Sequence, residues 1–528
     1  MSNHAYESAA ALRPSSNGPI PISTLCERFS LAPASAEDAA ALNDLSILGV
    51  SVDSADTAPG ELFVGLPGFT VHGARFAAQA VASGAVAVLT DADGAQIVHQ
   101  TAPGTPTLVH SDPRAVVGPL SAEVYHHPAR GLVTTAVTGT NGKTTTAYFL
   151  DAILSAHVGG CMVAGTVELR VGERSVESPR TTVEAPVLQR MMALAVEDKV
   201  GAASLEASSH AIVLHRLDGI VVDVAGFTNL QRDHLDFHKT MEGYLEAKAQ
   251  LFTPEHARRG VVCVDDQWGA TLAAEAPIEI DRVRAYPGDT PADWWVSDAA
   301  VSLTDSATTF TLHGPDGEKI EASCPLPGLV NVQNAALALV MAIRAGVPAA
   351  TAATALAGAH NIPGRTQRIS QRDGRRGLCI VDFAHTPDAM ELALKAVRPI
   401  TPGRLIVVFG SDGDRDQGKR PMLGEVCARL ADVLVVTDEN PRSEDPQLIR
   451  NAILEGVRGV RPDLTDVEEI TTWRGDAVRR GVELCGPDDT VIVTGKGHEP
   501  FLEMAGEFIR YNDAPVMAEA VEEKWGRA

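Results

Sequence analysis

The sequence predicts an α/β protein of three domains. Its 528 residues are too many for one hydrophobic core, and 45% of them are hydrophobic, as in a globular protein. Short apolar runs recur, each followed by a polar or glycine-containing turn and then by a longer helical pattern, which is typical of parallel βα units. Ligands of such sheets bind outside the carboxyl ends of the strands. The clearest runs are GAVAVLTD, DVAGFTNL, GVVCVDD, GLCIVDF, RLIVVFG, DVLVVTD and DTVIVTG.

Breaks in this pattern divide the chain into three blocks. Residues 1–130 form a small α/β pattern closed by the loop HHPARG, and residues 131–361 open with a glycine-containing turn. Within the second block, residues 301–327 alternate and are rich in turns, which predicts a small antiparallel insertion. Residues 362–528 begin at the PGR turn, which breaks the preceding Ala-rich helix, and they continue the βα pattern.

Composition and charge restrict the partners of the protein. The formal net charge of −24 argues against nucleic acid or an anionic membrane as the main partner, so local basic residues must hold anionic ligands. The seven cysteines are scattered without a CxxC pair, which indicates a reducing compartment and no structural zinc. Residues 1–18 lack the basic and apolar regions of a signal peptide, and no stretch is long enough to span a bilayer. We therefore expect a cytoplasmic protein.

The segment TAVTGTNGKTTT predicts a site for a nucleoside triphosphate. Residues 132–137 have the apolar character of a buried strand, and Gly139 and Gly142 allow the backbone to approach phosphate oxygens. Lys143 adds a positive charge at the start of the next helix, and Thr144 has a hydroxyl suited to magnesium. An ordinary strand–turn–helix connection is the alternative interpretation.

The segment ASLEASSHAIVLHRLDG adds a second group of polar residues. Glu206 ends an apolar run and would complete a magnesium site near the turn at residues 139–143, which is called the phosphate turn below. Ser209 and His210 suggest a hydrolase, but no G-x-S-x-G elbow surrounds either serine of the segment. A strand-to-helix turn with Ser208 as its N-cap is the simpler alternative.

Asp233, His234, Asp236 and His238 crowd into the next motif, FTNLQRDHLDFH. Such a group can be mistaken for a transition-metal cluster, but the oxygen ligands beside the phosphate turn favour magnesium over zinc. His234 would then reach a second divalent ion. Lys248 follows on a predicted helix, in YLEAK, where a lone lysine usually faces solvent.

The third block contributes polar residues at the ends of several predicted strands. Asp382 and His385 follow one strand, in VDFAHTPDAM. Arg415 and Arg442 are surrounded by acidic residues, so they serve either in surface ion pairs or in bidentate recognition of a carboxylate. The last turn, TGKGHEP, combines exposed backbone with both signs of charge and would suit a zwitterionic ligand.

Taken in order, these strings closely resemble the motifs of the Mur ligase family over nearly the whole chain. The strings are TGTNGKTT, EASSHA with HRLDG, FTNLQRDHLDFH, YLEAK, GLVNVQN, PGRTQRI, VDFAHTPDA, GDRDQGKRP, NPRSEDP and GKGHE. The resemblance implies a small N-terminal α/β domain for the uridine nucleotide, a central P-loop ATPase with a mostly parallel sheet, and a Rossmann-like C-terminal α/β domain that brings the amino acid. It also implies an ATP- and Mg²⁺-dependent, ADP-forming amide ligase of peptidoglycan precursor synthesis, and we expect a monomer.

The resemblance implies roles for individual residues. Lys143 would bind the β and γ phosphates, Thr144 and Glu206 one magnesium ion and His234 the second, while a carbamate on Lys248 would orient magnesium. The implied ATP-binding residues are Gly139, Thr140, Asn141, Gly142, Lys143, Thr144, Thr145, Asn331, Arg365, Asp382 and His385. Those for the UDP substrate are Ser54, Thr181, Thr182, Ser208 and Arg216. Those for the amino acid are Arg415, Asn440, Pro441, Arg442, Gly495 and Glu499.

The implied substrates are UDP-N-acetylmuramoyl-L-alanyl-D-glutamate and a diamino acid, and two departures bear on them. Many members have Asp-Ser-Arg in the uridine-binding loop, where this chain has Asp53, Ser54 and Ala55. Members that use meso-diaminopimelate usually have Asp-Asn-Pro-Arg, and here Glu439 replaces the aspartate. Arg442 is intact, and its guanidinium can pair with the second carboxylate that diaminopimelate has and lysine lacks. We favour meso-diaminopimelate, with L-lysine and L-ornithine as alternatives.

Two other functions compete with this interpretation. A folylpolyglutamate synthetase has a similar ATP turn and the same ligation chemistry, but the stretch PGELFVGLPGFTVHGARF resembles the uridine-binding domain. An ATP-driven binding protein or motor is the alternative outside the ligases.

Overall fold

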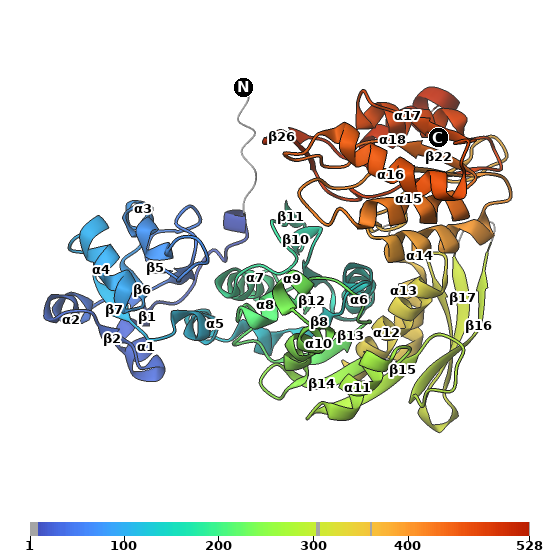
Figure 1. Ribbon diagram of the computed structural model, residues 1–528. Coiled ribbons are helices and arrows are strands. Elements are labelled where there is room, and N and C mark those ends of the chain that lie inside the picture. Colours follow the sequence, from blue (N-terminus) through green and yellow to red (C-terminus); the bar gives the residue numbers. More distant parts are fainter. Residues whose placement is uncertain (1–8, 303–306, 360–361, 527–528) are drawn as a thin grey trace. The chain divides into compact units, whose positions relative to one another are not determined.

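The computed structural model describes residues 9–302, 307–359 and 362–526 (Figure 1). The chain divides into two compact units. Unit 1 comprises Met1–Trp295 and Ala336–Ala355, and unit 2 comprises Val296–Ala335 and Leu356–Ala528, each within the described ranges. Each unit is described by itself below.

Unit 1 begins with a five-stranded sheet of order β2-β7-β6-β5-β4. Its parallel strands are β4 (Gly49–Ser51), β5 (Glu61–Val64), β6 (Ala87–Thr90) and β7 (Thr107–Val109), and β2 (Ala32–Pro33) is an antiparallel edge. The accompanying helices include α3 (Ala77–Ala82), α4 (Ala92–Thr101) and α5 (Pro113–Val124). The strands β5 and β6 are buried along their whole length, which explains their continuous apolar runs.

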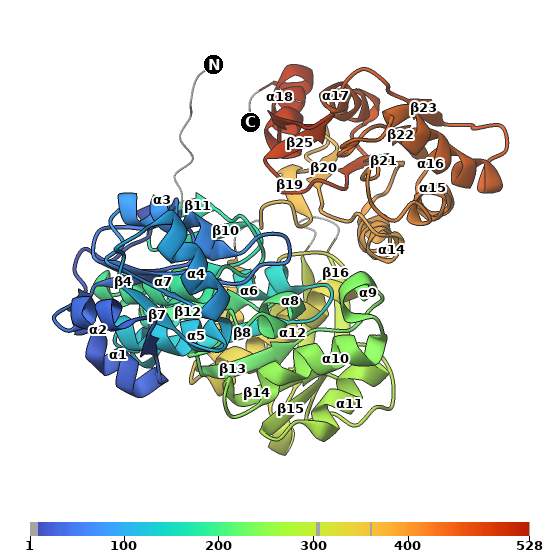
Figure 2. The same cartoon turned by 60° about the vertical axis from the view of Figure 1, so that its left-hand side comes forward.

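The larger sheet of unit 1 carries the phosphate turn. Its parallel strands, in the order β9-β12-β8-β13-β14-β15, are β9 (Cys161–Ala164), β12 (Ala202–Glu206), β8 (Val133–Thr138), β13 (Val222–Phe227), β14 (Ala257–Cys263) and β15 (Glu279–Arg284). The antiparallel β10 (Glu168–Val171) and β11 (Arg174–Glu177) extend one edge. The helices that accompany the sheet are α6 (Lys143–Val158), α7 (Ala185–Glu197), α8 (Ser209–Val213), α10 (Met241–Ala249) and α11 (Gln267–Glu275). Figure 2 shows α10 and α11 beside β13 and β14.

Unit 2 has a second mostly parallel sheet. Its order is β19 (Gln367–Ser370), β20 (Leu378–Val381), β24 (Thr490–Val493), β21 (Leu405–Phe409), β22 (Val433–Val436) and β23 (Val467–Glu469), and only the pairing of β19 is antiparallel. Its helices are α14 (Pro387–Val397), α15 (Lys419–Leu430), α16 (Pro446–Val460), α17 (Arg474–Leu484) and α18 (Asp513–Trp525). Two hairpins complete the unit, β17 (Thr308–His313) with β18 (Lys319–Cys324) and β25 (Phe501–Met504) with β26 (Glu507–Arg510).

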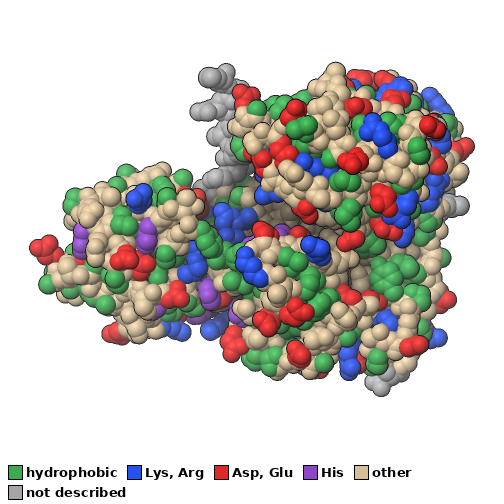
Figure 3. Space-filling model, in the orientation of Figure 1, with side chains coloured by type: hydrophobic (Ala, Val, Ile, Leu, Met, Phe, Trp, Pro, Cys, Tyr) green, Lys and Arg blue, Asp and Glu red, His purple; other side chains and the backbone are tan. Residues whose placement is uncertain are grey.

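The structure confirms the α/β fold class and its parallel strands. Each apolar run named from the sequence contains a strand of a parallel sheet. The hairpin of β17 and β18 confirms the antiparallel insertion, apart from residues 303–306, which lie outside the described residues. Six of the seven cysteines are buried and one, Cys26, is half-buried, and all seven are free thiols. Acidic side chains are scattered over the face in Figure 3 rather than gathered in one patch. In the described part of the chain, no helix is long and apolar enough to cross a membrane.

Candidate active site

The phosphate turn joins β8 to α6 and contains two glycines that the backbone requires. Gly139 has φ +143° and Gly142 has φ +90°, which are conformations that other residues rarely adopt. A Cβ on Gly139 would also lie 1.9 Å from Thr228 Oγ1. Because α6 begins at Lys143, its first backbone N–H groups face the turn and favour a bound anion.

Residues that follow β13 hold the turn in place. Asn141 donates from its backbone N–H to Asn229 Oδ1 at 3.1 Å and from its side chain to Gln231 Oε1 at 2.7 Å. Thr228 Oγ1 donates to the Asn141 carbonyl at 2.6 Å, and the Gln231 N–H donates to Thr140 Oγ1 at 2.9 Å. Sequence reasoning assigned no role to Thr228, Asn229 or Gln231, although they lie in the motif FTNLQRDHLDFH.

Lys143 and Thr144 lie at the start of α6, as the sequence predicts. Lys143 Nζ donates to the carbonyls of Gly139 at 3.0 Å and Thr140 at 2.8 Å, so its ammonium lies against the turn. Thr144 Oγ1 donates to Glu206 Oε2 at 3.0 Å. These two residues meet because β8 and β12 are neighbouring parallel strands that end at the same edge of the sheet.

Glu206 lies at the centre of a buried group of oxygen atoms. Its side chain is buried, and it accepts hydrogen bonds from the Thr166 N–H at 2.8 Å and from Thr166 Oγ1 at 2.9 Å. A Cβ on Gly165 would lie 2.2 Å from Glu206 Oε1, so the close approach requires glycine there. The carboxylate and the hydroxyls of Thr144 and Thr166 are hard oxygen donors, which fit magnesium better than a softer metal. Sequence reasoning missed Thr166.

Four of the five residues predicted for the UDP substrate surround this group. Thr182 Oγ1 donates to the Glu206 carbonyl at 2.7 Å and accepts from the Ser208 N–H at 3.0 Å, and Thr181 Oγ1 lies 3.2 Å from Thr166 Oγ1. Arg216 donates to the Thr182 carbonyl at 3.1 Å. Ser208 caps α8, which confirms the simpler interpretation of this serine, and its role toward the UDP substrate stays a prediction.

Arg216 also belongs to a group of arginines around one carboxylate. Glu184 lies 2.9 Å from Arg216 Nε, 3.1 Å from Arg180 and 3.5 Å from Arg114. The pKa of Arg216 is lowered overall. Burial lowers it most, Glu184 raises it, and the charges of Arg180 and Arg114 lower it further. The fifth predicted residue, Ser54, follows β4 and donates to Gln79 Oε1 at 3.0 Å.

Lys248 is buried, which contradicts the solvent-facing position that its helix alone suggested. Only 1% of the residue is exposed, and Nζ donates to the Gly139 carbonyl at 2.8 Å. The ammonium also lies 4.5 Å from the centre of the Tyr244 ring. Burial, followed by the nearby charge of Lys143, lowers the pKa of Lys248 well below its usual value. Both effects disfavour the ammonium form, so Lys248 loses its proton at a lower pH than an exposed lysine does.

The histidines of this region pack against one another. The His234 ring lies 4.9 Å from the His210 ring, and His238 stacks on Tyr244 at 4.8 Å. Burial lowers the pKa of His234, and it lowers that of His238 to about 4. Neutral imidazoles at pH 7 can act as ligands of a divalent ion. In the described ranges, no three His, Cys, Asp or Glu side chains are grouped as a metal cluster.

The remaining residues predicted for ATP lie in unit 2. Asp382 follows β20 and accepts from the Thr366 N–H at 2.7 Å. The Arg365 guanidinium lies 4.3 Å from the centre of the Phe383 ring. His385 Nδ1 lies 2.9 Å from the Phe383 carbonyl, and burial lowers the pKa of His385. The last of the set is Asn331, which donates to the Pro327 carbonyl at 2.8 Å.

The structure brings most of the predicted amino-acid residues together in unit 2. Asn440 Nδ2 donates to Glu499 Oε2 at 3.1 Å. Arg442 has φ +55° and lies 3.4 Å from Glu503 and 3.9 Å from Asp412. The other members of the set are Pro441, between these two residues, Gly495, after β24, and Arg415, which is exposed on the loop before α15.

Glu439, the departure noted in the sequence, is buried beside this group. Only 2% of it is exposed, and a Cβ on Gly495, which has φ +106°, would lie 2.6 Å from Glu439 Oε2. Burial, followed by the charge of Asp412, raises the pKa of Glu439 from its usual 4.5 to about 8. The carboxyl group therefore keeps its proton to a higher pH than an exposed glutamate does.

We expect Glu439→Gln to flatten the pH dependence of stability. An acid whose pKa rises on folding contributes stability that is fully present below its unfolded pKa of 4.5 and is lost as the pH rises towards about 8. One such group changes the free energy of unfolding by at most about 1.4 kcal/mol per pH unit in that window. Thermal unfolding across this range checks the prediction, with Glu507→Gln as an exposed control. Parallel profiles for the wild type and Glu439→Gln would contradict it.

Comparisons with known proteins match most of the chain. Three family models match, the Mur ligase family catalytic domain at residues 46–123, the Mur ligase middle domain at 137–342 and the Mur ligase glutamate ligase domain at 364–497. The UDP-N-acetylmuramoyl-L-alanyl-D-glutamate–2,6-diaminopimelate ligase of Streptomyces coelicolor is 43% identical over 91% of this chain and 93% of its own length. The UDP-N-acetylmuramyl-tripeptide synthetase of Leifsonia xyli is 42% identical over 95% of this chain and 96% of its own length.

A solved structure agrees with these relatives. A UDP-N-acetylmuramoyl-L-alanyl-D-glutamate–2,6-diaminopimelate ligase is 31% identical to this chain, with a TM-score of 0.63 over 92% of this chain and 96% of that one. The similarity therefore extends over the sequence and the fold.

Proposed function

The chain belongs to the Mur ligase family and is an ATP-dependent, ADP-forming ligase, and we propose that it joins meso-diaminopimelate to UDP-N-acetylmuramoyl-L-alanyl-D-glutamate. The observation that carries this proposal is the 43% identity, over nearly the full length, to a relative named for that reaction. We further propose a cytoplasmic location and domain boundaries at 1–130, 131–361 and 362–528.

The first step would form an acyl phosphate. A carboxylate oxygen of the terminal D-glutamate attacks the γ-phosphorus of ATP, the bond from that phosphorus to the bridging oxygen breaks, and ADP leaves. Lys143 and the first N–H groups of α6 would hold the phosphates, because both present positive charge to the turn. The hydroxyls and backbone of Thr140, Asn141 and Thr145 complete this turn in the proposal.

The fit of the oxygen group around Glu206 supports magnesium at this site. Thr144 and Glu206 would hold one ion, and His234 with a carbamate on Lys248 would hold or orient the second. Bound magnesium would neutralise the negative charge of the phosphates. Thr181, Thr182, Ser208 and Arg216 would bind the muramoyl-dipeptide beside this group, and Ser54 would contact the uridine part.

The second step would form the amide bond. The free amino group of the diamino acid attacks the acyl carbon, the bond from carbon to the phosphate oxygen breaks, and inorganic phosphate leaves while the nitrogen loses a proton. The pocket proposed for the amino acid consists of Arg415, Asn440, Pro441, Arg442, Gly495 and Glu499. In unit 2, Asn331, Arg365, Asp382 and His385 are proposed to contact ATP.

The identity of the amino acid rests on Arg442. A planar guanidinium recognises a carboxylate bidentately, and diaminopimelate has a carboxylate at the end where lysine and ornithine have none. In the structure this guanidinium lies near Asp412 and Glu503, which hold it in the loop after β22. L-Lysine and L-ornithine are the alternatives that Glu439 keeps open.

A competition assay offering meso-diaminopimelate, L-lysine and L-ornithine together tests this choice. We expect nearly all product to contain meso-diaminopimelate, and we expect Arg442→Ala to raise the KM for it by about 10- to 100-fold, since charged hydrogen bonds contribute about 1.5–3 kcal/mol. The exposed Arg429→Ala serves as the control. A clear preference of the wild type for L-lysine would overturn the role given to Arg442.

Release of ADP separates the proposal from its rivals. A ligase of this type releases ADP only when UDP-N-acetylmuramoyl-L-alanyl-D-glutamate and the amino acid are both present. A folylpolyglutamate synthetase would instead require a folate and glutamate, and an ATP-driven binding protein would respond to a polymer or protein partner. Measuring ADP with each set of additions distinguishes the three.

A further inference from the structure

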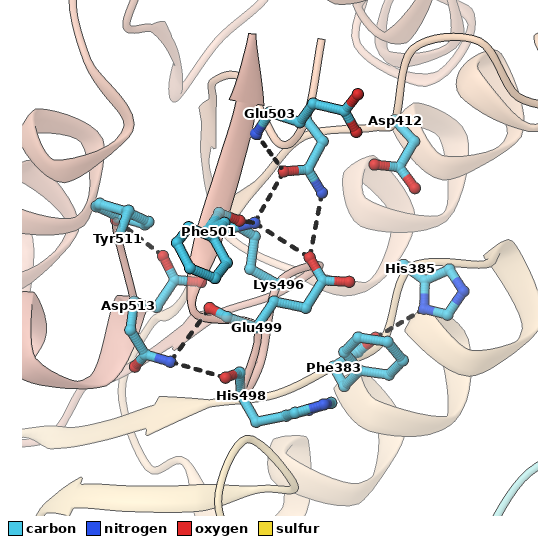
Figure 4. A network of polar contacts seen from close by, with 12 residues as sticks. Phe383, His385, Asp412, Lys496, His498, Glu499, Phe501, Glu503, Tyr511 and Asp513 are labelled. Carbon is cyan, nitrogen blue, oxygen red and sulfur yellow. Dashed lines mark hydrogen bonds and ion pairs between the residues drawn. The ribbon is translucent and has the colours of Figure 1, made fainter. Parts of the chain in front are cut away.

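Lys496 is a buried lysine to which the proposed reaction gives no task. It lies in the turn after β24 and is 0% exposed. Its Nζ donates to Asn440 Oδ1 at 2.9 Å, to Glu499 Oε2 at 3.1 Å, and to the Phe501 carbonyl (Figure 4). An ammonium group has three donors, so these three acceptors use all of them.

The contacts of Lys496 fix which way the Asn440 amide faces. Asn440 Oδ1 also accepts from the Glu503 N–H at 3.2 Å, while Nδ2 donates to Glu499 Oε2. A flipped amide would place its NH₂ group against two donors, which is unfavourable in a buried site. The amide therefore keeps its NH₂ group directed towards Glu499.

The same contacts divide the Glu499 carboxylate into two oxygens with different roles. Oε2 accepts from both Lys496 and Asn440, at 3.1 Å in each case. Neither contact uses Oε1, and Asn440 Nδ2 has a second hydrogen besides the one that it directs to Glu499.

We propose that Lys496 is a positioning residue of the amino-acid pocket, which orients Asn440 and Glu499 so that they receive the zwitterionic part of the diamino acid. The inference rests on the proposed function, because it takes Asn440 and Glu499 as pocket residues. Burying an ammonium group is costly unless it is fully paired, and two of its three partners here are side chains of that pocket.

A purely structural role is the competing explanation, because Lys496 also holds the Phe501 carbonyl at the start of β25. Lys524, which is exposed, provides a control for the loss of three hydrogen bonds from a lysine outside the pocket. Its Nζ donates to three backbone carbonyls, those of Val482, Glu483 and Cys485, and to no side chain of the pocket. Replacing either lysine with methionine removes three hydrogen bonds while keeping a long apolar side chain.

The test compares Lys496→Met with Lys524→Met in the full-length enzyme. For Lys496→Met we expect the KM for the diamino acid to rise by about 10- to 100-fold, the range for loss of a charged hydrogen bond, with the KM for ATP changed less than about twofold. For Lys524→Met we expect a lower melting temperature with both KM values unchanged. An unchanged KM for the diamino acid in Lys496→Met, or an equal rise in Lys524→Met, would overturn the proposal.

A double-mutant cycle distinguishes positioning from a direct contact. If Lys496 acts through Glu499, Lys496→Met should raise the KM for the diamino acid much less in a Glu499→Ala background than in the wild type. Equal effects in both backgrounds would contradict the mechanism.

A check of folding and a check of the amino-acid substrate complete the test. Should Lys496→Met fail to fold by circular dichroism, Lys496→Gln is judged by the same KM criterion, and loss of folding in both variants would assign Lys496 to stability alone and overturn the proposal. Release of ADP by the wild type with each amino acid is measured first. Turnover that depends on another amino acid would contradict the proposed substrate, and the ratio of variant to wild-type KM for that amino acid would still test Lys496.

Discussion

Lys143→Ala is expected to lower kcat for ADP release by about two to three orders of magnitude while the protein stays folded. Removing one preorganised donor at a developing charge typically costs that much. The Lys143 ammonium lies against the turn at the carbonyls of Gly139 and Thr140, where the terminal phosphates of ATP would bind. Steady-state ADP release with all substrates at saturation measures the effect.

The control for this prediction is Lys319→Ala, which removes an exposed lysine from β18. Both variants should retain the circular dichroism spectrum of the wild type, because Lys143 lies at the start of α6 and not in its packed middle. Full turnover by Lys143→Ala would show that the triphosphate binds elsewhere.

The phosphate turn could be predicted from the sequence because its signals are local. The apolar run before Gly139, the glycines and Lys143 follow one another within a single strand–turn–helix unit. The same holds for the strands of both large sheets, since continuous apolar runs are typical of strands buried on both faces. Thr144 and Glu206 could be linked only by assuming that their strands are neighbours, which the pairing of β8 with β12 confirms.

The residues that sequence reasoning missed act through contacts between distant segments. Thr166 bonds to Glu206 from the residues after β9, and Gln231 bonds to Asn141 from the residues after β13. Neither has a local pattern that would reveal such a partner. Lys248 shows the same limit, because it is buried in α10 together with Tyr244 and Leu245, and nothing in the helix sequence shows that this position lies against the phosphate turn. Only the resemblance to the Mur ligases pointed to it.

Lys248→Ala is expected to lower kcat by about two to three orders of magnitude, and a short carboxylate such as acetate should restore part of the loss. Burial and the charge of Lys143 depress the pKa of Lys248, which favours the neutral amine. Its nitrogen can then add to the carbon of CO₂ and lose one proton, which gives a carbamate. That group would place a carboxylate-like anion in the site, and added acetate would replace this anion in the alanine variant.

Rescue by carboxylate separates the carbamate from a simpler role for Lys248. As an unmodified ammonium, Lys248 would only hold the Gly139 carbonyl at 2.8 Å, and an added anion would not replace a lost donor. Lys143→Ala is the matched control, because it loses a cation of the same turn and no acetate concentration should restore it. Assays of the wild type in buffer freed of CO₂ should show a slow loss of activity that bicarbonate reverses. Full activity of Lys248→Ala without any added carboxylate would exclude the carbamate. A large loss of activity that acetate does not restore would instead indicate that Lys248 acts as an ammonium group bonded to the Gly139 carbonyl.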